Sequence, residues 1–169
     1  LAQHLAAMSE IPKGICAVLG DEDGSLGLAL ARTKDYQVHV LTQNADTAKM
    51  LQQQADAEGL YGKQIVIEPY SYLENLPFAE NTIDWIVSTQ LTDSLLSSAF
   101  LTDVLQSLRP RGHAILGVCS DSSSSFKPQQ IKRALKEAGI EQYSVFKDTH
   151  GLWAKITKPD LEGIDEWTH

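Results

Sequence analysis

The sequence predicts a three-layer α/β/α sandwich built on a mostly parallel sheet, and two observations lead to it. Short continuous apolar runs alternate along the chain with segments whose apolar residues follow helical spacing. The last two apolar runs are separated only by residues 147–151, which predicts an antiparallel hairpin. Because alternating strands and helices form parallel sheets that are covered on both faces, we expect seven strands with an antiparallel last strand.

The first half of the chain contains three expected strands and two expected helices. Residues 26–32 carry the leucines and alanines of a short helix. A second helix begins after Asn44, whose side chain can cap it, and ends at Gly59 as a left-handed cap. The strands are the short apolar runs at residues 15–19, 38–41 and 65–67.

The second half continues the alternation. A long helix is expected over residues 93–108, because apolar residues stand four apart along one side, and residues 109–112 then break it. After a serine-rich loop at residues 120–125, Pro128 begins a helix that Gly139 ends. The remaining strands are the apolar runs at residues 83–88, 113–118, 143–146 and 152–156.

Composition excludes several classes of protein. Apolar residues make up 43% and charged residues 21% of the chain, which excludes wholesale disorder. The net charge of −8 argues against a nucleic-acid partner, which needs a basic surface. No apolar run approaches the roughly 18 residues of a membrane span. Cys16 and Cys119 are too few for a disulfide framework or a zinc site, and we expect both to be buried free thiols.

Ligands of such sheets bind at the carboxyl ends of the strands, beside the first strand. The loop there, residues 18–26, holds Gly20 and Gly24, and it resembles the first motif of class I S-adenosylmethionine-dependent methyltransferases, Asp-x-Gly-x-Gly-x-Gly. Gly20 and Gly24 match the first and third glycines, whereas Val18 stands for the acid and Glu22 for the middle glycine. An alternative is that both glycines merely form a turn of a parallel sheet.

Later landmarks of the same family match more closely. Residues 74–78 and 81–88 resemble its Leu-Pro-Phe segment and fourth strand, and residues 108–113 resemble the turn before its fifth strand. The resemblance covers residues 14–156 and implies a Rossmann-like sandwich of the methyltransferase type. Two family acids that would bind the ribose and the adenine are replaced, by Thr42 and by residues 70–72.

The resemblance also implies where a cofactor would bind, and it implies no catalytic residue and no metal ligand. The acids at residues 21–23 are interpreted as solvated rather than as a cation site, which needs six or more oxygens from several positions. The positions that would contact S-adenosylmethionine are Gly20, Asp21, Glu22, Gly24, Thr42, Gln43, Ser71, Tyr72, Thr89 and Gln90.

A second resemblance lies at the end of the chain. Residues 153–159 and 164–169 look like the junction in large bacterial quinoproteins, in which a methyltransferase-like module precedes a β-propeller related to pyrroloquinoline-quinone alcohol dehydrogenases. This implies a methyltransferase-like domain over residues 1–158 and a linker from 159 to 169. The following propeller of the same chain would be the partner and would carry any pyrroloquinoline quinone. The chain is then a piece of a longer protein.

Two functions follow from these resemblances. One is a degenerate, non-catalytic module of a quinoprotein alcohol dehydrogenase-like protein; the other is an active methyltransferase with an unknown acceptor. Three polar contacts to the cofactor are absent, each worth about 1–2 kcal/mol, and their loss would weaken cofactor affinity by about two to four orders of magnitude. This favours the non-catalytic module. An active enzyme would be cytoplasmic, with the S-adenosylmethionine pool, whereas the quinoprotein resemblance implies an exported or periplasmic protein.

Overall fold

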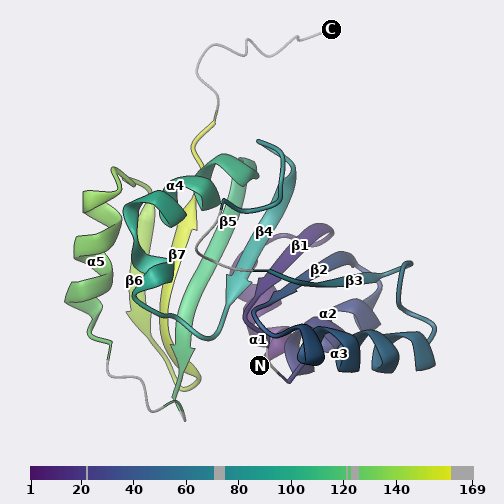
Figure 1. Cartoon of the computed structure of the whole chain (residues 1–169). Coiled ribbons are helices and arrows are strands. Elements are labelled where there is room, and N and C mark those ends of the chain that lie inside the picture. Colours follow the sequence, from purple (N-terminus) through teal and green to yellow (C-terminus); the bar gives the residue numbers. More distant parts are fainter. Residues whose placement is uncertain (22, 71–74, 121, 123–125, 161–169) are drawn as a thin grey trace, which may run out of the picture.

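The computed structural model describes residues 1–21, 23–70, 75–120, 122 and 126–160. In this part of the chain seven strands form one sheet in the order β3-β2-β1-β4-β5-β7-β6 (Figure 1). Strands β1 to β5 run parallel, and β7 is antiparallel to both of its neighbours. The strands are β1 (Gly14–Leu19), β2 (Tyr36–Thr42), β3 (Ile65–Pro69), β4 (Ile83–Ser88), β5 (Leu108–Cys119), β6 (Tyr143–Lys147) and β7 (Gly151–Thr157).

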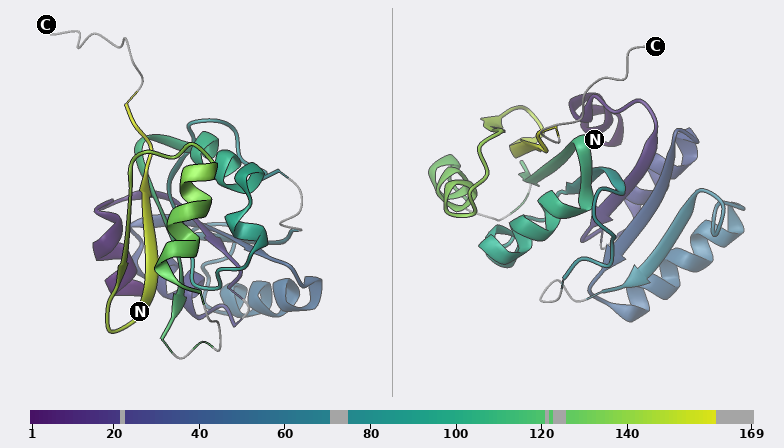
Figure 2. Two further views of the ribbon diagram at one scale, coloured as in Figure 1. Left: turned by 90° about the vertical axis from the view of Figure 1, so that its left-hand side faces the viewer. Right: turned by 90° about the horizontal axis from the view of Figure 1, so that it is seen from above.

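Helices cover both faces of the sheet, which confirms the three-layer sandwich (Figure 2). Alternate strand residues face two separate cores. One core packs against α4, α5 and the 3₁₀ turn η1, and the other packs against α1, α2 and α3. The helices are α1 (Ala2–Ser9), α2 (Ser25–Thr33), α3 (Ala45–Ala57), η1 (Ser94–Leu96), α4 (Ser98–Ser107) and α5 (Pro128–Glu137).

Local signals placed several boundaries correctly. The Asn44 side chain accepts hydrogen bonds from the backbone N–H groups of Asp46 and Thr47 at the start of α3. Gly59 follows the end of that helix with a φ of 67°, as a left-handed cap requires. Pro128 is the first residue of α5. The predicted hairpin is β6–β7.

The helix predicted over residues 93–108 is wrong in its extent. Ser97 has an extended backbone and its side chain accepts a hydrogen bond from Phe100 N–H, so it caps a new helix instead of continuing the previous turn. The segment therefore divides into η1 and α4. Strand β5 already begins at Leu108, because this residue pairs with Ile83 of β4. The register of the two strands then shifts before Trp85 pairs with His113.

Helix α1 was not predicted. Its N-cap is Leu1, which makes no side-chain capping bond, so the usual start signal is absent from the sequence. Leu5 of this helix is fully buried against the sheet. The segment is rich in alanine, leucine and methionine, which favour a helix, but a helix of eight residues is marginal by itself, so the burial of Leu5 adds the stability that it needs.

Neither Cys16 nor Cys119 forms a disulfide, as expected. Cys16 in β1 is fully buried, whereas Cys119 at the end of β5 is only half-buried, so the expectation of burial is wrong for Cys119. Strand β4 lies between β1 and β5, which keeps the two thiols apart. Among the described residues, no helix is both long and apolar enough to cross a bilayer.

Candidate functional site

A hollow of about 610 Å³ lies at the carboxyl ends of β1, β4 and β5. The loop between β1 and α2 contributes Asp21, Asp23 and Ser25, and the segment after β4 contributes residues 89–92. The end of β5 contributes Val118, Cys119 and Ser122. Its volume lies within the roughly 300–1,000 Å³ of small-molecule pockets, and its place is where α/β sheets bind ligands.

Asp21 is the most buried acid of this hollow, with 5% of its surface exposed. Its Oδ2 accepts a hydrogen bond from Gly27 N–H at 2.7 Å, and its Oδ1 accepts one from Leu26 N–H at 3.3 Å. The carboxylate thereby caps the first turn of α2. Burial nevertheless dominates and raises the pKa of Asp21 to about 6.

Asp23 lies at the rim of the same hollow and is exposed. Its Oδ1 accepts a hydrogen bond from Ser25 N–H at 2.9 Å, and this bond lowers the pKa of Asp23. Near neutral pH both Asp21 and Asp23 are ionised. The end of the hollow beside α2 is therefore negative and favours a ligand group of positive charge.

The segment after β4 is held in place by backbone bonds. Gln90 forms an isolated antiparallel bridge with Val118, and its N–H donates to Ser88 Oγ at 3.3 Å. Leu91 N–H donates to Gly117 O at 2.9 Å. The loop is thus tied to β5, which fixes Thr89 and Gln90 on the wall of the hollow.

The remaining predicted cofactor positions are distributed differently. Thr42, the last residue of β2, is fully buried, and Gln43 is exposed; neither lines the hollow. Gly20 and Gly24 are buried beside it without lining it. Glu22, Ser71 and Tyr72 lie outside the described residues. Of the ten predicted positions, the structure brings Asp21, Thr89 and Gln90 together around one space.

The sequence matches no protein-family model and no curated protein, but several solved structures that are named as methyltransferases have a similar fold. A structure named as an S-adenosyl-L-methionine-dependent methyltransferase of Methanococcus maripaludis aligns with a TM-score of 0.81 at 20% identity, over 96% of this chain and 85% of that one. The chain has the fold of class I S-adenosylmethionine-dependent methyltransferases. A SAM-dependent methyltransferase of Aquifex aeolicus aligns with a TM-score of 0.72 at 15% identity, over 92% of this chain and 89% of that one. The geranyl diphosphate C-methyltransferase of Streptomyces coelicolor aligns with a TM-score of 0.74 at 11% identity, over 95% of this chain and 78% of that one.

Within this methyltransferase fold, Gly24 has a structural explanation. Its φ is 69°, in the left-handed region that favours glycine. A Cβ added there would lie 2.1 Å from Cδ2 of Leu51, a fully buried residue of α3. The glycine therefore allows the start of α2 to approach α3 closely, a role that needs no cofactor.

Replacing Gly24 with alanine is expected to destabilise the chain by about 2 kcal/mol, through the left-handed backbone and the collision with Leu51. Urea unfolding of Gly24→Ala, Leu51→Ala and the double variant measures the coupling. If Leu51 is the obstacle, Gly24→Ala will cost less in the Leu51→Ala background. Equal costs in both backgrounds would show that the backbone conformation alone is responsible.

Sequence reasoning missed the third wall of the hollow. Val118, Cys119 and Ser122 lie where β5 ends, and the serine-rich segment that follows was interpreted only as a surface loop. The rule that placed the ligand at the carboxyl ends of the parallel strands applies to β5 as well, so the signal was present. Asp23 was missed as a wall residue because the acidic run was interpreted as solvated.

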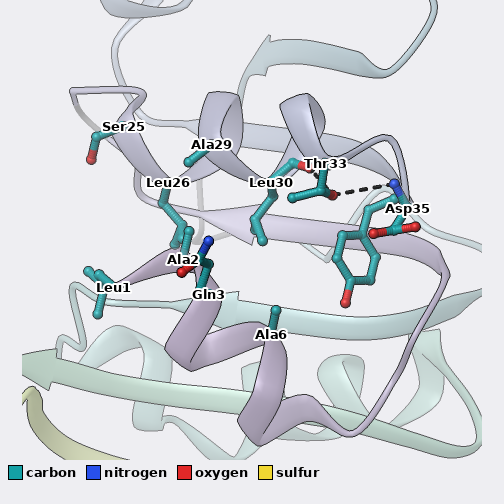
Figure 3. A pocket seen from close by; sticks show the side chains of 11 residues that line it. Leu1, Ala2, Gln3, Ala6, Ser25, Leu26, Ala29, Leu30, Thr33 and Asp35 are labelled. Carbon is teal, nitrogen blue, oxygen red and sulfur yellow. Dashed lines mark hydrogen bonds between the residues drawn. The ribbon is translucent and has the colours of Figure 1, made fainter.

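A second hollow of about 600 Å³ lies between α1 and α2 (Figure 3). It shares Leu1, Ser25 and Leu26 with the first hollow, so the two spaces adjoin. Figure 3 shows mainly small and apolar side chains around it, among them Ala6 and Leu30, with Asp35 at one end. A ligand in the first hollow could extend an apolar group into this one.

Proposed function

We propose that this chain is a methyltransferase-fold module that has lost cofactor binding and methyl transfer. The observation that carries the proposal is Thr42. At the position where the family's acid would accept hydrogen bonds from both ribose hydroxyls, this chain has a fully buried threonine that does not line the hollow. The described hollow is lined by the loop before α2 and by the segments that follow β4 and β5.

Two further positions support the same proposal. Val18 stands for the acid of the first motif, and its apolar side chain is almost fully buried. Residues 70–72 replace the acid near the adenine. If each lost charged contact costs about 1–2 kcal/mol, three of them cost roughly 3–6 kcal/mol. A micromolar site would then weaken by about two to four decades.

An active methyltransferase is the second candidate, and one observation favours it. Asp21 and Asp23 place negative charge at one end of a hollow large enough for a small molecule, which suits the ammonium and sulfonium groups of S-adenosylmethionine. Methyl transfer needs little more than in-line placement of a nucleophile, so a catalytic signature is not required.

The larger protein to which the module would belong is inferred from the sequence alone. The resemblance of the chain end to quinoprotein junctions supports a following β-propeller as the partner, with pyrroloquinoline quinone bound there. In that setting the module is a docking or structural element outside the inner membrane. An active enzyme would instead work in the cytoplasm.

Calorimetric titration with S-adenosylmethionine and S-adenosylhomocysteine tests the proposal. We expect a dissociation constant of about 0.1 mM or weaker, and therefore no binding heat and no change in melting temperature at about 10 μM ligand. An active site would give micromolar binding and, at about a hundred times the dissociation constant, a rise of roughly 5–10 °C. That result would overturn the proposal. The variant Asp23→Asn would then report whether the rim carboxylate holds the cation, by weakening the measured binding.

A further inference from the structure

Three side chains that no step above uses meet beside the hairpin β6–β7. His4 belongs to α1, whereas Asp148 and His150 belong to the turn between the two strands. Each offers one ligand atom, and these atoms all lie within 4.8 Å of one another. His4 Nε2 lies 2.7 Å from Asp148 Oδ2, and the two imidazole rings stack with centroids 4.1 Å apart. Two imidazoles and a carboxylate thus lie side by side in one small, half-buried cluster.

The carboxylate of Asp148 is oriented by the fold. Its Oδ1 accepts hydrogen bonds from His150 N–H at 2.8 Å, from Gly151 N–H at 3.0 Å and from Trp153 Nε1–H at 3.0 Å. Oδ2 therefore faces the imidazoles in a fixed direction. Partial burial would raise the pKa of Asp148, but the donors from Trp153, His4 and the turn outweigh it and hold the pKa at about 2.

We propose that His4, Asp148 and His150 bind a divalent transition-metal ion, with Zn²⁺ as the representative. Imidazole nitrogens and one carboxylate suit Zn²⁺, Co²⁺ and Ni²⁺, whereas Mg²⁺ and Ca²⁺ prefer oxygen ligands. Three protein ligands leave a coordination position for water or a ligand. The bonds to Asp148 Oδ1 are the outer contacts that orient a ligating carboxylate.

Binding requires a local rearrangement that the site can accommodate. Ligand atoms around a tetrahedral ion with bonds of about 2.0–2.1 Å lie roughly 3.3 Å apart, so the His4–Asp148 hydrogen bond must give way to the ion. The rings lie 22° from parallel and must turn until their lone pairs converge. The side chains of His4 and Asp148 are 32% and 23% exposed, which leaves room to turn. His150 Nδ1 lies 3.2 Å from Thr149 Oγ1, which leaves Nε2 as its ligand atom.

The site is distinct from the candidate cofactor hollow, although it is close to it. None of its three residues lines that hollow. Its connection runs through the backbone, because Ser120 N–H donates to His150 O at 2.8 Å and Gly151 pairs with Cys119. A bound ion would fasten α1 to the hairpin and so stabilise the folded chain. The inference is independent of whether the module binds S-adenosylmethionine.

Titration of Co²⁺ and Zn²⁺ into the chain, without a polyhistidine tag, tests the proposal. We expect one Co²⁺ per chain with visible d–d absorption that Zn²⁺ removes, and a melting temperature that rises with Zn²⁺ by roughly 5–10 °C at about a hundred times the dissociation constant. His4→Ala and His150→Gln should each abolish the absorption and the rise while keeping the native circular dichroism. The use of two variants keeps the test valid if one of them fails to fold.

Control variants identify binding elsewhere. His39 pairs with Glu68 at 2.8 Å, and Cys119 is a thiol that lines the hollow. The variants His39→Ala and Cys119→Ser should bind Co²⁺ as the wild type does. Absence of a spectrum and of a melting shift at about millimolar metal would overturn the proposal. Binding that persists in both His4→Ala and His150→Gln would overturn it as well, and the cluster would then be a hydrogen-bonded clasp only.

Discussion

Replacing Gly117 with alanine is expected to lower the free energy of unfolding by about 3 kcal/mol or more. Gly117 lies in β5 directly opposite Trp153 of β7. A Cβ added there would lie 2.2 Å from the backbone oxygen of Leu152 and 2.4 Å from Cε3 of Trp153. The carbonyl belongs to the sheet and Trp153 is fully buried, so neither can move aside without disturbing the core.

Urea and thermal unfolding measure this loss, and Gly59→Ala is the matched control. Gly59, unlike Gly117, has a left-handed backbone, with a φ of 67°, but a Cβ there would meet nothing within 4 Å. The control should cost only about 1–2 kcal/mol. For a chain of this size each kcal/mol corresponds to roughly 2–4 °C in melting temperature. Similar losses in the two variants would show that the contact with β7 is not limiting.

The sheet could be predicted from the sequence because its signals are local. Apolar runs marked the strands, and Asn44, Gly59 and Pro128 marked helix boundaries through bonds and backbone angles that they make themselves. The errors occurred where apolar spacing and the usual start signals did not determine the outcome. Leu5 is buried by the sheet although α1 lacks a capping side chain, and Ser97 divides a segment whose apolar spacing was continuous.

The sequence was enough to predict where in the fold the candidate site lies, but not which side chains line it. Alternation of strands and helices predicts a parallel sheet whose loops meet at one edge, and the observed strand order places the loops after β1 and β4 together, with Asp21, Thr89 and Gln90. The depth at which each side chain lies is a property of packing, which is why Thr42 was expected at the surface of a cofactor site and is buried. His4 and Asp148 are 144 positions apart, and no sequence pattern relates them.

The second large effect that we expect is a dependence of stability on pH, caused by Asp21. Its pKa is about 6 in the folded chain, because of burial, and near 3.9 when unfolded. Between about pH 4 and pH 6 the folded chain therefore keeps a proton that the unfolded chain releases. Stability from this group is present at low pH and is lost as the pH rises through that window. The loss amounts to about 2–3 kcal/mol, at about 1.4 kcal/mol per pKa unit.

The variant Asp21→Asn keeps the size of the side chain and an oxygen that can accept the bond from Gly27 N–H. We expect it to be more stable than the wild type by about 2–3 kcal/mol above pH 7. The difference should shrink as the pH falls and vanish near pH 4. Urea unfolding of both proteins from pH 4 to pH 8 measures it. A constant difference across this range would show that Asp21 does not titrate within it.

Asp23→Asn is the control of opposite sign, two residues away. The bond from Ser25 N–H lowers the pKa of Asp23, so its stabilisation is present above the unfolded pKa and is lost as the pH falls below it. The wild type should therefore be the more stable protein at pH 7 in this pair and lose its advantage in acid. Two carboxylates at the start of one helix would then act in opposite directions, because one is buried and the other is exposed. A general charge effect at the start of α2 would instead give both variants the same sign.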